Sequence, residues 1–415
     1  MRVTEIEVHE VTLDYDEHRV HELSHYYFSR RRTIYVVHAD NGLIGLGESG
    51  STVSQDVIDQ YIGTNPFEWV GDETSLGLGT AMYDLMGKAV GVPVYKLFGP
   101  KQRSWVPVAG WTVATDPERM AAAVVNLAGL GHTWMKFHLS PFENVFEQTK
   151  AMQAVAPEGF KLHYDFTMHG TDDHMSELLD ALAEYSIAGC FEDPLPGEDL
   201  EGYIDLRRRA KRPIVLHHFP MRATYEVLMG PADAYMLGHY TIGESVRRAG
   251  LFDAGGSPFM LQNTGGQITR TMIAHMMAAF PTATFHSVSA TESLVGDVVV
   301  ERLQPINGFV RVPEQPGLGL TLDREALERY KSAKSPVDEG WILKTTFKNE
   351  TQMYNLMTPD KPHFMVRPDW SGSLPMSYAA PLETEYWDDD GSPEFAEMRA
   401  RIEREDTVLI GKESG

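Results

Sequence analysis

The chain has 415 residues, 42% of them hydrophobic, and its 59 acidic and 36 basic side chains give a formal net charge of −23. This length can bury a large core in two or three domains, although an α/β barrel alone can use ~250 residues. So acidic a surface repels nucleic acid and anionic membranes, and no apolar stretch approaches the ~20 residues of a membrane helix. We therefore expect neither partner, whereas a small anionic substrate needs a local cluster of cations or a metal.

Cys190 is the only cysteine, so no intrachain disulfide can form. The N-terminal run MRVTEIEVHEV alternates like a strand and does not resemble a signal sequence. Both features favour a reducing compartment. We expect a soluble, cytoplasmic protein that forms a homo-oligomer.

The first 50 residues contain alternating runs at Thr33–Ala39 and Leu43–Glu48, which are typical of antiparallel strands. Before them lies HRVHELSHYYFSRRR, with three histidines, two tyrosines and four arginines. This segment is either a solvated loop or a lid that supplies cations and aromatic rings to a substrate. In the second case Tyr26 and Arg30 are candidates for substrate binding.

A helical pattern covers residues 65 to 97, and the sequence after it consists of one repeated strand–helix unit. Each unit has a short apolar run, a polar residue at its C-terminal end and an amphipathic helix. The strand candidates are Thr133–His138, Lys161–Thr167, Gly189–Glu192, Pro213–His218, Ala234–His239, Pro258–Gln262 and Thr284–Glu292. Their ends recur every ~20–30 residues, which predicts a closed parallel βα barrel. A doubly wound sheet has similar spacing, but its glycine-rich phosphate loop is missing.

The barrel rhythm stops near Leu322. The rest is rich in Trp, Tyr, Pro and Asp, with one predicted helix at Pro393–Arg404. Because three tryptophans lie in this C-terminal extension, we expect it to be ordered and to pack on the rest of the protein or on a neighbouring subunit.

Polar residues end four successive strands of the predicted barrel. Lys136 and His138 are two apart, so both can face the barrel axis. Asp165, Glu192 and His218 end the next three strands. This order predicts a base beside a divalent metal that three adjacent strands bind.

His217 points towards the helices if strand alternation continues to that position.

The series resembles the mandelate racemase and muconate lactonizing branch of the enolase superfamily. The matching pieces, which cover roughly residues 1–325, are GLIGLGES, YDLMGKAVGVPVYKLFGP, WMKFH, HYDF, FEDPLP, PIVLHH and ATESLVGD. The resemblance implies a (β/α)7β TIM-like barrel with an α+β capping domain. We assign residues 1–108 to the capping domain and 109–305 to the barrel. Residues 306–415 return to the capping domain and form the extension.

The resemblance also implies removal of a proton α to a carboxylate, with a divalent metal, usually magnesium, stabilising the enediolate. By position, Lys136 matches the base, and Asp165 and Glu192 match the first two metal ligands. His218 stands where a third carboxylate is expected, so Mn, Fe or Zn would also suit the site. Glu292 matches an acid near the substrate carboxylate.

Three departures from the family pattern bear on the reaction. Gly238 and Gln262 hold the places of an Asp–His dyad, which disfavours a two-base racemase and leaves Gln262 as a substrate contact. His239 is one residue off and faces the barrel only if its strand shifts or bulges. His138 replaces a lysine, and His169 follows Asp165 at a longer spacing than the catalytic histidine of some sugar-acid dehydratases.

These features predict a dehydratase (lyase) of an acid sugar or hydroxy acid. Lys136 or His138 would remove the α proton, with Lys136 as the expected base, and His169 or His239 would protonate the departing hydroxide. One alternative is a cycloisomerase or an epimerase or racemase of a carboxylate. Another, of a different class, is a metal-free barrel that binds a ligand without catalysis.

Overall fold

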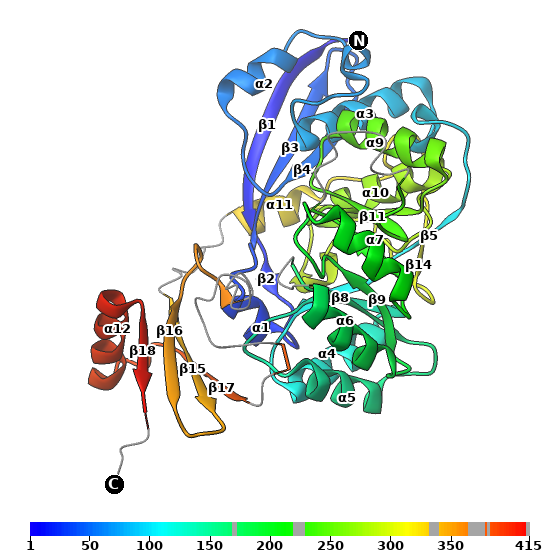
Figure 1. Ribbon diagram of the computed structural model, residues 1–415. Coiled ribbons are helices and arrows are strands. Elements are labelled where there is room, and N and C mark those ends of the chain that lie inside the picture. The colour runs from blue at the N-terminus through cyan, green and yellow to red at the C-terminus, as the bar shows by residue number, and fades with distance from the viewer. Residues whose placement is uncertain (168–171, 219–228, 332–339, 364–377, 380–381, 412–415) are drawn as a thin grey trace.

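The computed structural model describes residues 1–167, 172–218, 229–331, 340–363, 378–379 and 382–411. Three larger sheets organise this part of the chain: a three-stranded sheet, a curled parallel sheet and a four-stranded antiparallel sheet (Figure 1). No helix in the described part is both long and apolar enough to cross a membrane.

The N-terminal sheet is antiparallel and has the order β1-β3-β4. Its strands are β1 (Val3–Thr12), β3 (Arg31–Ala39) and β4 (Ile44–Ser49). The helix α3 (Leu76–Val90) packs closely against β4, because a Cβ at Gly47 would lie 2.0 Å from the carbonyl oxygen of Gly77. Helix α2 (Gln55–Tyr61) lies beside the same sheet, and α11 (Arg324–Lys331) returns to it late in the chain through an ion pair between Arg324 and Glu7.

The central sheet has seven parallel strands in chain order. They are β6 (Gly110–Val113), β7 (Trp134–His138), β8 (Lys161–Asp165), β9 (Ala188–Glu192), β10 (Ile214–Leu216), β11 (Ala234–Gly238) and β12 (Phe259–Gln262). Parallel bridges join Ser287 to Val108 and Val288 to Gln262, so this segment closes the ring in the eighth position. The structure therefore confirms the barrel and excludes an open doubly wound sheet. The last strand is shorter than predicted, because residues 291–293 form a 3-10 helix.

Helices follow the barrel strands on the outside of the ring (Figure 1). They are α4 (Pro117–Gly129), α5 (Val145–Val155), α6 (Asp172–Ala183), α7 (Leu200–Arg209), α9 (Ile242–Gly255) and α10 (Gln267–Ala279). Helix α4 has Asp116 as its N-cap, whose carboxylate accepts a hydrogen bond from the Arg119 N–H at 3.0 Å. Because all strands run the same way, their C-terminal ends meet at one mouth.

The C-terminal extension folds as a sheet that the sequence analysis missed. Its strands are β15 (Trp341–Phe347), β16 (Gln352–Met357), β17 (Leu382–Trp387) and β18 (Thr407–Ile410), in the order β17-β15-β16-β18. The predicted helix is present as α12 (Pro393–Glu405). The strands were missed because runs such as KTTFKNETQ are polar on both faces, so they lack the alternation of a half-buried strand.

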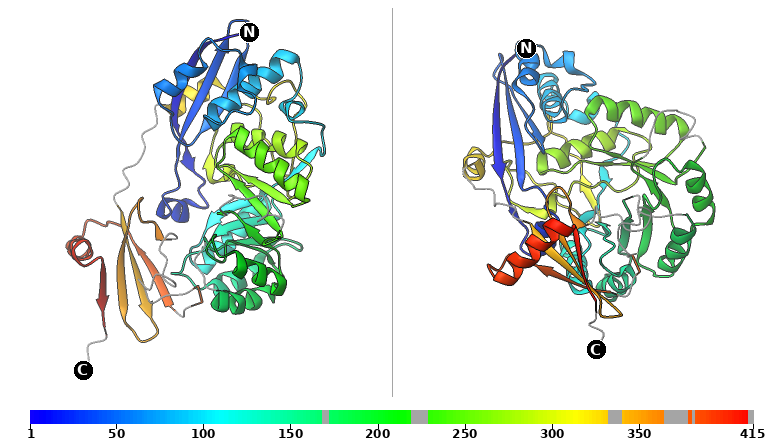
Figure 2. Two further views of the ribbon diagram at one scale, coloured as in Figure 1. Left: turned by 45° about the horizontal axis from the view of Figure 1, so that its top comes forward. Right: turned by 60° about the vertical axis from the view of Figure 1, so that its left-hand side comes forward.

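This sheet lies beside helix α1 (Val20–His25) and the barrel, at the opposite end of the molecule from α2 (Figures 1 and 2). The Trp341 indole donates to the carbonyl oxygen of His25 at 3.2 Å, and the Tyr27 hydroxyl donates to that of Met357 at 2.8 Å. Phe142, from the loop after β7, is buried among apolar residues of the sheet. The described part of the extension is therefore folded and contacts the segments that surround the barrel mouth.

Glu143 lies at this contact and should make it sensitive to pH. The side chain is buried and accepts a hydrogen bond from Tyr386, and burial raises its pKa from 4.5 to about 7. The folded protein thus holds a proton that the unfolded chain releases, so stability should fall as pH rises from about 4.5 to 7. Glu143→Gln, which keeps an acceptor without a charge, should be more stable than the parent at pH 8 by up to about 3 kcal/mol.

Urea denaturation between pH 5 and pH 8 measures this difference. Glu158→Gln is the control, because Glu158 is exposed. An unchanged pH dependence in Glu143→Gln would show that the carboxyl is ionised in the folded protein.

Candidate functional site

Lys136 is the centre of a buried charge cluster inside the barrel. Its Nζ lies 3.0 Å from Asp165 Oδ2, 2.7 Å from Glu192 Oε2 and 2.9 Å from Gln262 Oε1. Burial by itself would lower the pKa of Lys136, but the two carboxylates outweigh it and raise the pKa. The ammonium therefore stays charged and holds two carboxylates together.

His138 lies next to this cluster at the end of β7. Strand register puts it beside Asp165, and Asp165 beside Glu192. Its Nε2 is 2.9 Å from Asp165 Oδ2, and its Nδ1 is 2.9 Å from the hydroxyl of Tyr26. The segment around α1, predicted as either a solvated loop or a lid, thus places an aromatic side chain against the predicted site.

A cavity of about 260 Å³ opens beside His138. The α1 loop, β3, β6, β7, β11, β12 and the eighth strand position contribute to its wall. It is lined by Tyr26, Tyr27, Phe28, Ser29, Arg32, Trp111, His138, His239, Gln262, Thr264, Val288 and Ala290. Four residues predicted from the sequence are thereby brought together, namely Tyr26, His138, His239 and Gln262. None of the described lining residues is acidic, although the protein as a whole is strongly negative.

His239 reaches the cavity through a turn at the end of β11. Its φ of 61° places it in the left-handed region, and its backbone N–H donates to Asn263 Oδ1 at 2.9 Å. This turn directs the side chain inward, although simple strand alternation would direct it outward. Burial, together with the neighbouring His217 and Lys136, lowers its pKa to about 4, so the imidazole is neutral.

The two histidines after β10 are placed differently from the prediction. His217 does not face the helices, because its Nδ1 lies 3.2 Å from Glu192 Oε1. His218 Nδ1 instead contacts Asp193 Oδ2 at 2.7 Å, and its side chain is 49% exposed. Asp193 also accepts the backbone N–H of both histidines, at 2.8 and 3.1 Å. The strand has already ended at Leu216, so alternation does not extend to these positions.

The predicted ligand trio of Asp165, Glu192 and His218 is therefore not assembled. Asp165 Oδ2 and Glu192 Oε2 are buried and lie in ion-pair contact with Lys136, at 3.0 and 2.7 Å. His217 Nδ1 is also buried and lies 3.2 Å from Glu192 Oε1. Carboxylate oxygens suit Mg²⁺, and a set with one imidazole also suits Mn²⁺ or Zn²⁺. Asp165, Glu192 and His217 are therefore candidate ligands, although they are not one of the described groups whose ligand atoms all lie within 4.8 Å of one another. The ammonium of Lys136 lies within 3.0 Å of both carboxylates.

A second possible ligand group among the described residues is Asp193 with His217 and His218, whose ligand atoms lie within 4.8 Å of one another. Here the Asp193 carboxylate already accepts two backbone N–H groups and the His218 ring. We favour Asp165 and Glu192 as the oxygen ligands, because Asp165 contacts the cavity residue His138 and Glu192 lies beside Asp165 in the strand register.

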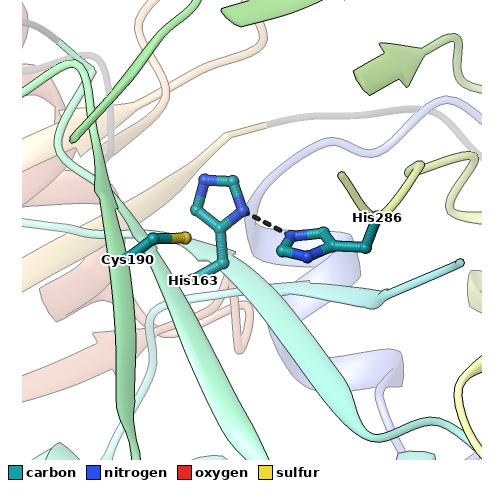
Figure 3. Close-up of side chains that lie close together, drawn as sticks. All are labelled: His163, Cys190 and His286. Atoms are coloured by element: carbon teal, nitrogen blue, oxygen red, sulfur yellow. Dashed lines mark hydrogen bonds between the residues drawn. The ribbon is translucent and has the colours of Figure 1, made fainter. Parts of the chain in front are cut away.

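Below the charge cluster, His163, Cys190 and His286 meet in the barrel interior (Figure 3). His163 contacts Glu192 Oε2 through Nε2 at 2.7 Å and His286 through Nδ1 at 2.8 Å. Burial lowers the pKa of both histidines and raises that of the thiol, so all three are neutral. Because both His163 nitrogens are engaged, the group orients Glu192.

Glu292, predicted to lie near the substrate carboxylate, is not among the described residues that line the cavity. Its Oε1 accepts the Trp111 backbone N–H at 2.8 Å, and its other oxygen pairs with Arg270. Arg19 also donates to its carbonyl oxygen. These contacts join the 3-10 helix to β6 and α10, so Glu292 stabilises the fold at this point.

Arg30 is also placed outside the cavity. Its guanidinium is 3.4 Å from Asp14 and lies over the Tyr15 ring. Arg32, two residues later on the same strand face, lines the cavity instead. No pattern in the sequence distinguishes the three consecutive arginines, so this choice needed the structure. His169 lies outside the described residues.

The model of the family described as Enolase C-terminal domain-like matches residues 119–326. Because the match spans half of the chain, the protein belongs to the enolase superfamily. It is a member of the mandelate racemase and muconate lactonizing branch, as the resemblance implied.

The arabinonate dehydratase of Saccharolobus solfataricus is 24% identical over 268 residues, 61% of this chain and 71% of the relative. The D-xylonate dehydratase of Haloferax volcanii is 26% identical over 355 residues, 71% and 84% of the two chains. Relatives named as a racemase and a muconate cycloisomerase also match. A solved structure named as an enolase from Thermobispora bispora, complexed with magnesium and formate, has 23% identity and a TM-score of 0.66. It covers 80% of this chain and 92% of its own.

Proposed function

We propose that the protein is a dehydratase that acts on a sugar acid or a related hydroxy acid. The observation that carries this proposal is His138. This histidine lines a cavity whose described wall has no acidic side chain, and its Nε2 contacts the buried carboxylate of Asp165 at 2.9 Å. Relatives named as dehydratases of arabinonate and D-xylonate support the same reaction class.

His138 is a better candidate for the base than Lys136. All three N–H bonds of the Lys136 ammonium have acceptors in Asp165, Glu192 and Gln262, and its side chain is fully buried. If the His138 Nε2–H donates to Asp165, Nδ1 is the nitrogen that accepts, and the Tyr26 hydroxyl lies 2.9 Å from it. A substrate would displace the Tyr26 hydroxyl from Nδ1 to place its α carbon there.

One histidine can complete the elimination. Nδ1 takes the proton from C2, and Asp165 stabilises the imidazolium that forms. The C–H electron pair becomes the C2=C3 bond as the C3–O bond breaks. The hydroxide takes the proton back from the imidazolium and leaves as water. The resulting enol exchanges protons with solvent and becomes a 2-keto-3-deoxy acid.

Asp165, Glu192 and His217 would hold a divalent cation, for which magnesium is the first choice and Mn, Fe or Zn are alternatives. When bound, it would attract the substrate carboxylate and stabilise the negative charge that develops on proton removal. Lys136 adds a fixed positive charge to the same region.

Single replacements of the two adjacent histidines test this ligand set. His217→Ala should weaken Mn²⁺ binding by about 100-fold, whereas His218→Ala should leave it within about threefold of the parent. Equilibrium dialysis with Mn²⁺ measures both affinities without any substrate. A large loss in His218→Ala alone would restore the trio predicted from the sequence.

An epimerase or racemase is the second candidate. The specific observation in its favour is His239, a neutral imidazole that lines the same cavity as His138. Two such groups on opposite faces of a substrate could remove and return one proton. The buried carboxylates and the cavity histidines give no support to a non-catalytic ligand-binding barrel.

A library of sugar acids tests the proposed reaction. With Mg²⁺ or Mn²⁺ present, at least one acid should yield a 2-keto-3-deoxy acid, detected as its semicarbazone, and chelation should remove the activity. Epimerised or cyclised products from the same library would favour the isomerase alternatives. No product from any acid would contradict both readings.

A further inference from the structure

Arg32 has a buried guanidinium whose Nε and Nη2 make no hydrogen bond with any described residue, although Glu48 lies 3.4 Å from Nε. It is the second residue of β3, is 4% exposed and lines the cavity. A buried guanidinium without partners is costly unless a ligand satisfies it.

Glu48 is the nearest carboxylate, with Oε1 at 3.4 Å from Arg32 Nε. Its oxygens are already engaged: Oε1 accepts the Gly266 N–H at 2.6 Å, and Oε2 accepts the N–H and the hydroxyl of Thr269 at 3.1 and 2.9 Å. Glu48 therefore holds the start of α10. Glu48 and, at longer range, Asp297 partly balance the charge of Arg32, but neither accepts a hydrogen bond from Nε or Nη2.

Arg32 and His138 lie over different parts of the barrel mouth. Glu48 lies near the end of β4, which pairs with the start of β3. Its bonds hold this pair of strands beside the loop between β12 and α10, on the side where Gln262 and Thr264 line the cavity. His138 ends β7, and β6 and the eighth strand position separate β7 from β12. A ligand in this cavity can therefore touch both residues only with two separate parts.

We propose that Arg32 binds a second carboxylate of the substrate, so that the preferred substrates are hydroxy dicarboxylic acids of the aldarate class. One carboxylate would lie at the Asp165 and Glu192 end beside His138, and the other would accept two N–H bonds from the Arg32 fork. The absence of acidic side chains from the described cavity wall fits such an anion. A volume of about 260 Å³ suits a small acid. This inference rests on the proposed function for the placing of the first carboxylate.

Matched pairs of acids test the inference. Galactarate and galactonate have the same carbon chain and stereochemistry and differ only in the oxidation of C6. We would measure kcat/KM and calorimetric affinity for the metal-loaded protein, with glucarate and gluconate as a second pair. The dicarboxylate should be preferred by about 100-fold, and Arg32→Met should remove this preference while changing the monocarboxylate less than about threefold.

Arg31→Met is the matched control, because Arg31 is exposed and pairs with Glu10 at 2.8 Å. It should leave the preference unchanged. If Arg32→Met does not fold, Arg32→Lys keeps the charge and should bind the dicarboxylate more weakly than the parent.

Several results would overturn the inference. They are a preference for the monocarboxylate, a preference for the 6-phosphate of galactonate, equal losses for both acids in Arg32→Met, and binding of none of these acids. Binding of galactarate that depends on Arg32, without any dehydration, would support the inference while the proposed function fails. Dehydration of monocarboxylates alone would support the proposed function and overturn the inference about Arg32.

Discussion

Replacing His138 with asparagine should lower kcat/KM for dehydration by about 10³-fold. Asparagine keeps a polar group near the Nδ1 position but cannot accept the α proton. It is too short to reach Asp165, whose Oδ2 lies 2.9 Å from His138 Nε2 in the parent and stays paired with Lys136. The variant should therefore fold and bind substrate with little change. Steady-state kinetics with the acid that the library identifies measures the loss.

Tyr26→Phe is the companion variant. It removes the hydroxyl that faces His138 Nδ1, so it should keep the base and retain activity within about tenfold. If Tyr26→Phe loses as much as His138→Asn, the tyrosine transfers the proton. If activity survives in His138→Asn and disappears in His239→Asn, the base is His239.

Replacing Lys136 with methionine should destabilise the fold by about 3–5 kcal/mol, because Asp165 and Glu192 would then lie buried without their cation. Lys136 Nζ is within 3.0 Å of an oxygen of each carboxylate, and all three side chains are almost fully buried. Urea denaturation of the chelated protein measures the loss.

The double variant Lys136→Met, Glu192→Gln shows whether the loss of stability comes from the missing positive charge or from the changed packing of the side chain. Removing one of the two negative charges should recover part of the lost stability, whereas Glu192→Gln in the parent should itself be destabilising. A single Lys136→Met variant as stable as the parent would mean that the ammonium does not balance these carboxylates.

The sequence predicted the fold because each βα unit carries the same local pattern. The strand ends at Lys136, Asp165 and Glu192 could be aligned with one another, and the register places them side by side as expected. The polar strands of the C-terminal sheet have no such pattern, so only helix α12 was predicted there.

The details of the site depend on contacts that alternation does not encode. Asp193 accepts the backbone N–H groups of both His217 and His218. In this turn the His217 side chain contacts Glu192, and the His218 side chain contacts Asp193. The left-handed backbone of His239 turns a residue inward that a regular strand would turn outward. Arg32 is selected over Arg30 only by the path of β3 across the cavity.

Proton NMR of the reaction in D₂O tests the central claim most directly. Proton removal at C2 by His138 and loss of the C3 hydroxyl should give a 2-keto-3-deoxy acid that carries one deuterium and one proton at C3. The resonance of this C3 proton should be absent when His138→Asn is used. Deuterium at C2 of an otherwise unchanged or epimerised acid would instead identify an isomerase. An unaltered C2 proton in every acid of the library, with metal bound, would contradict the account.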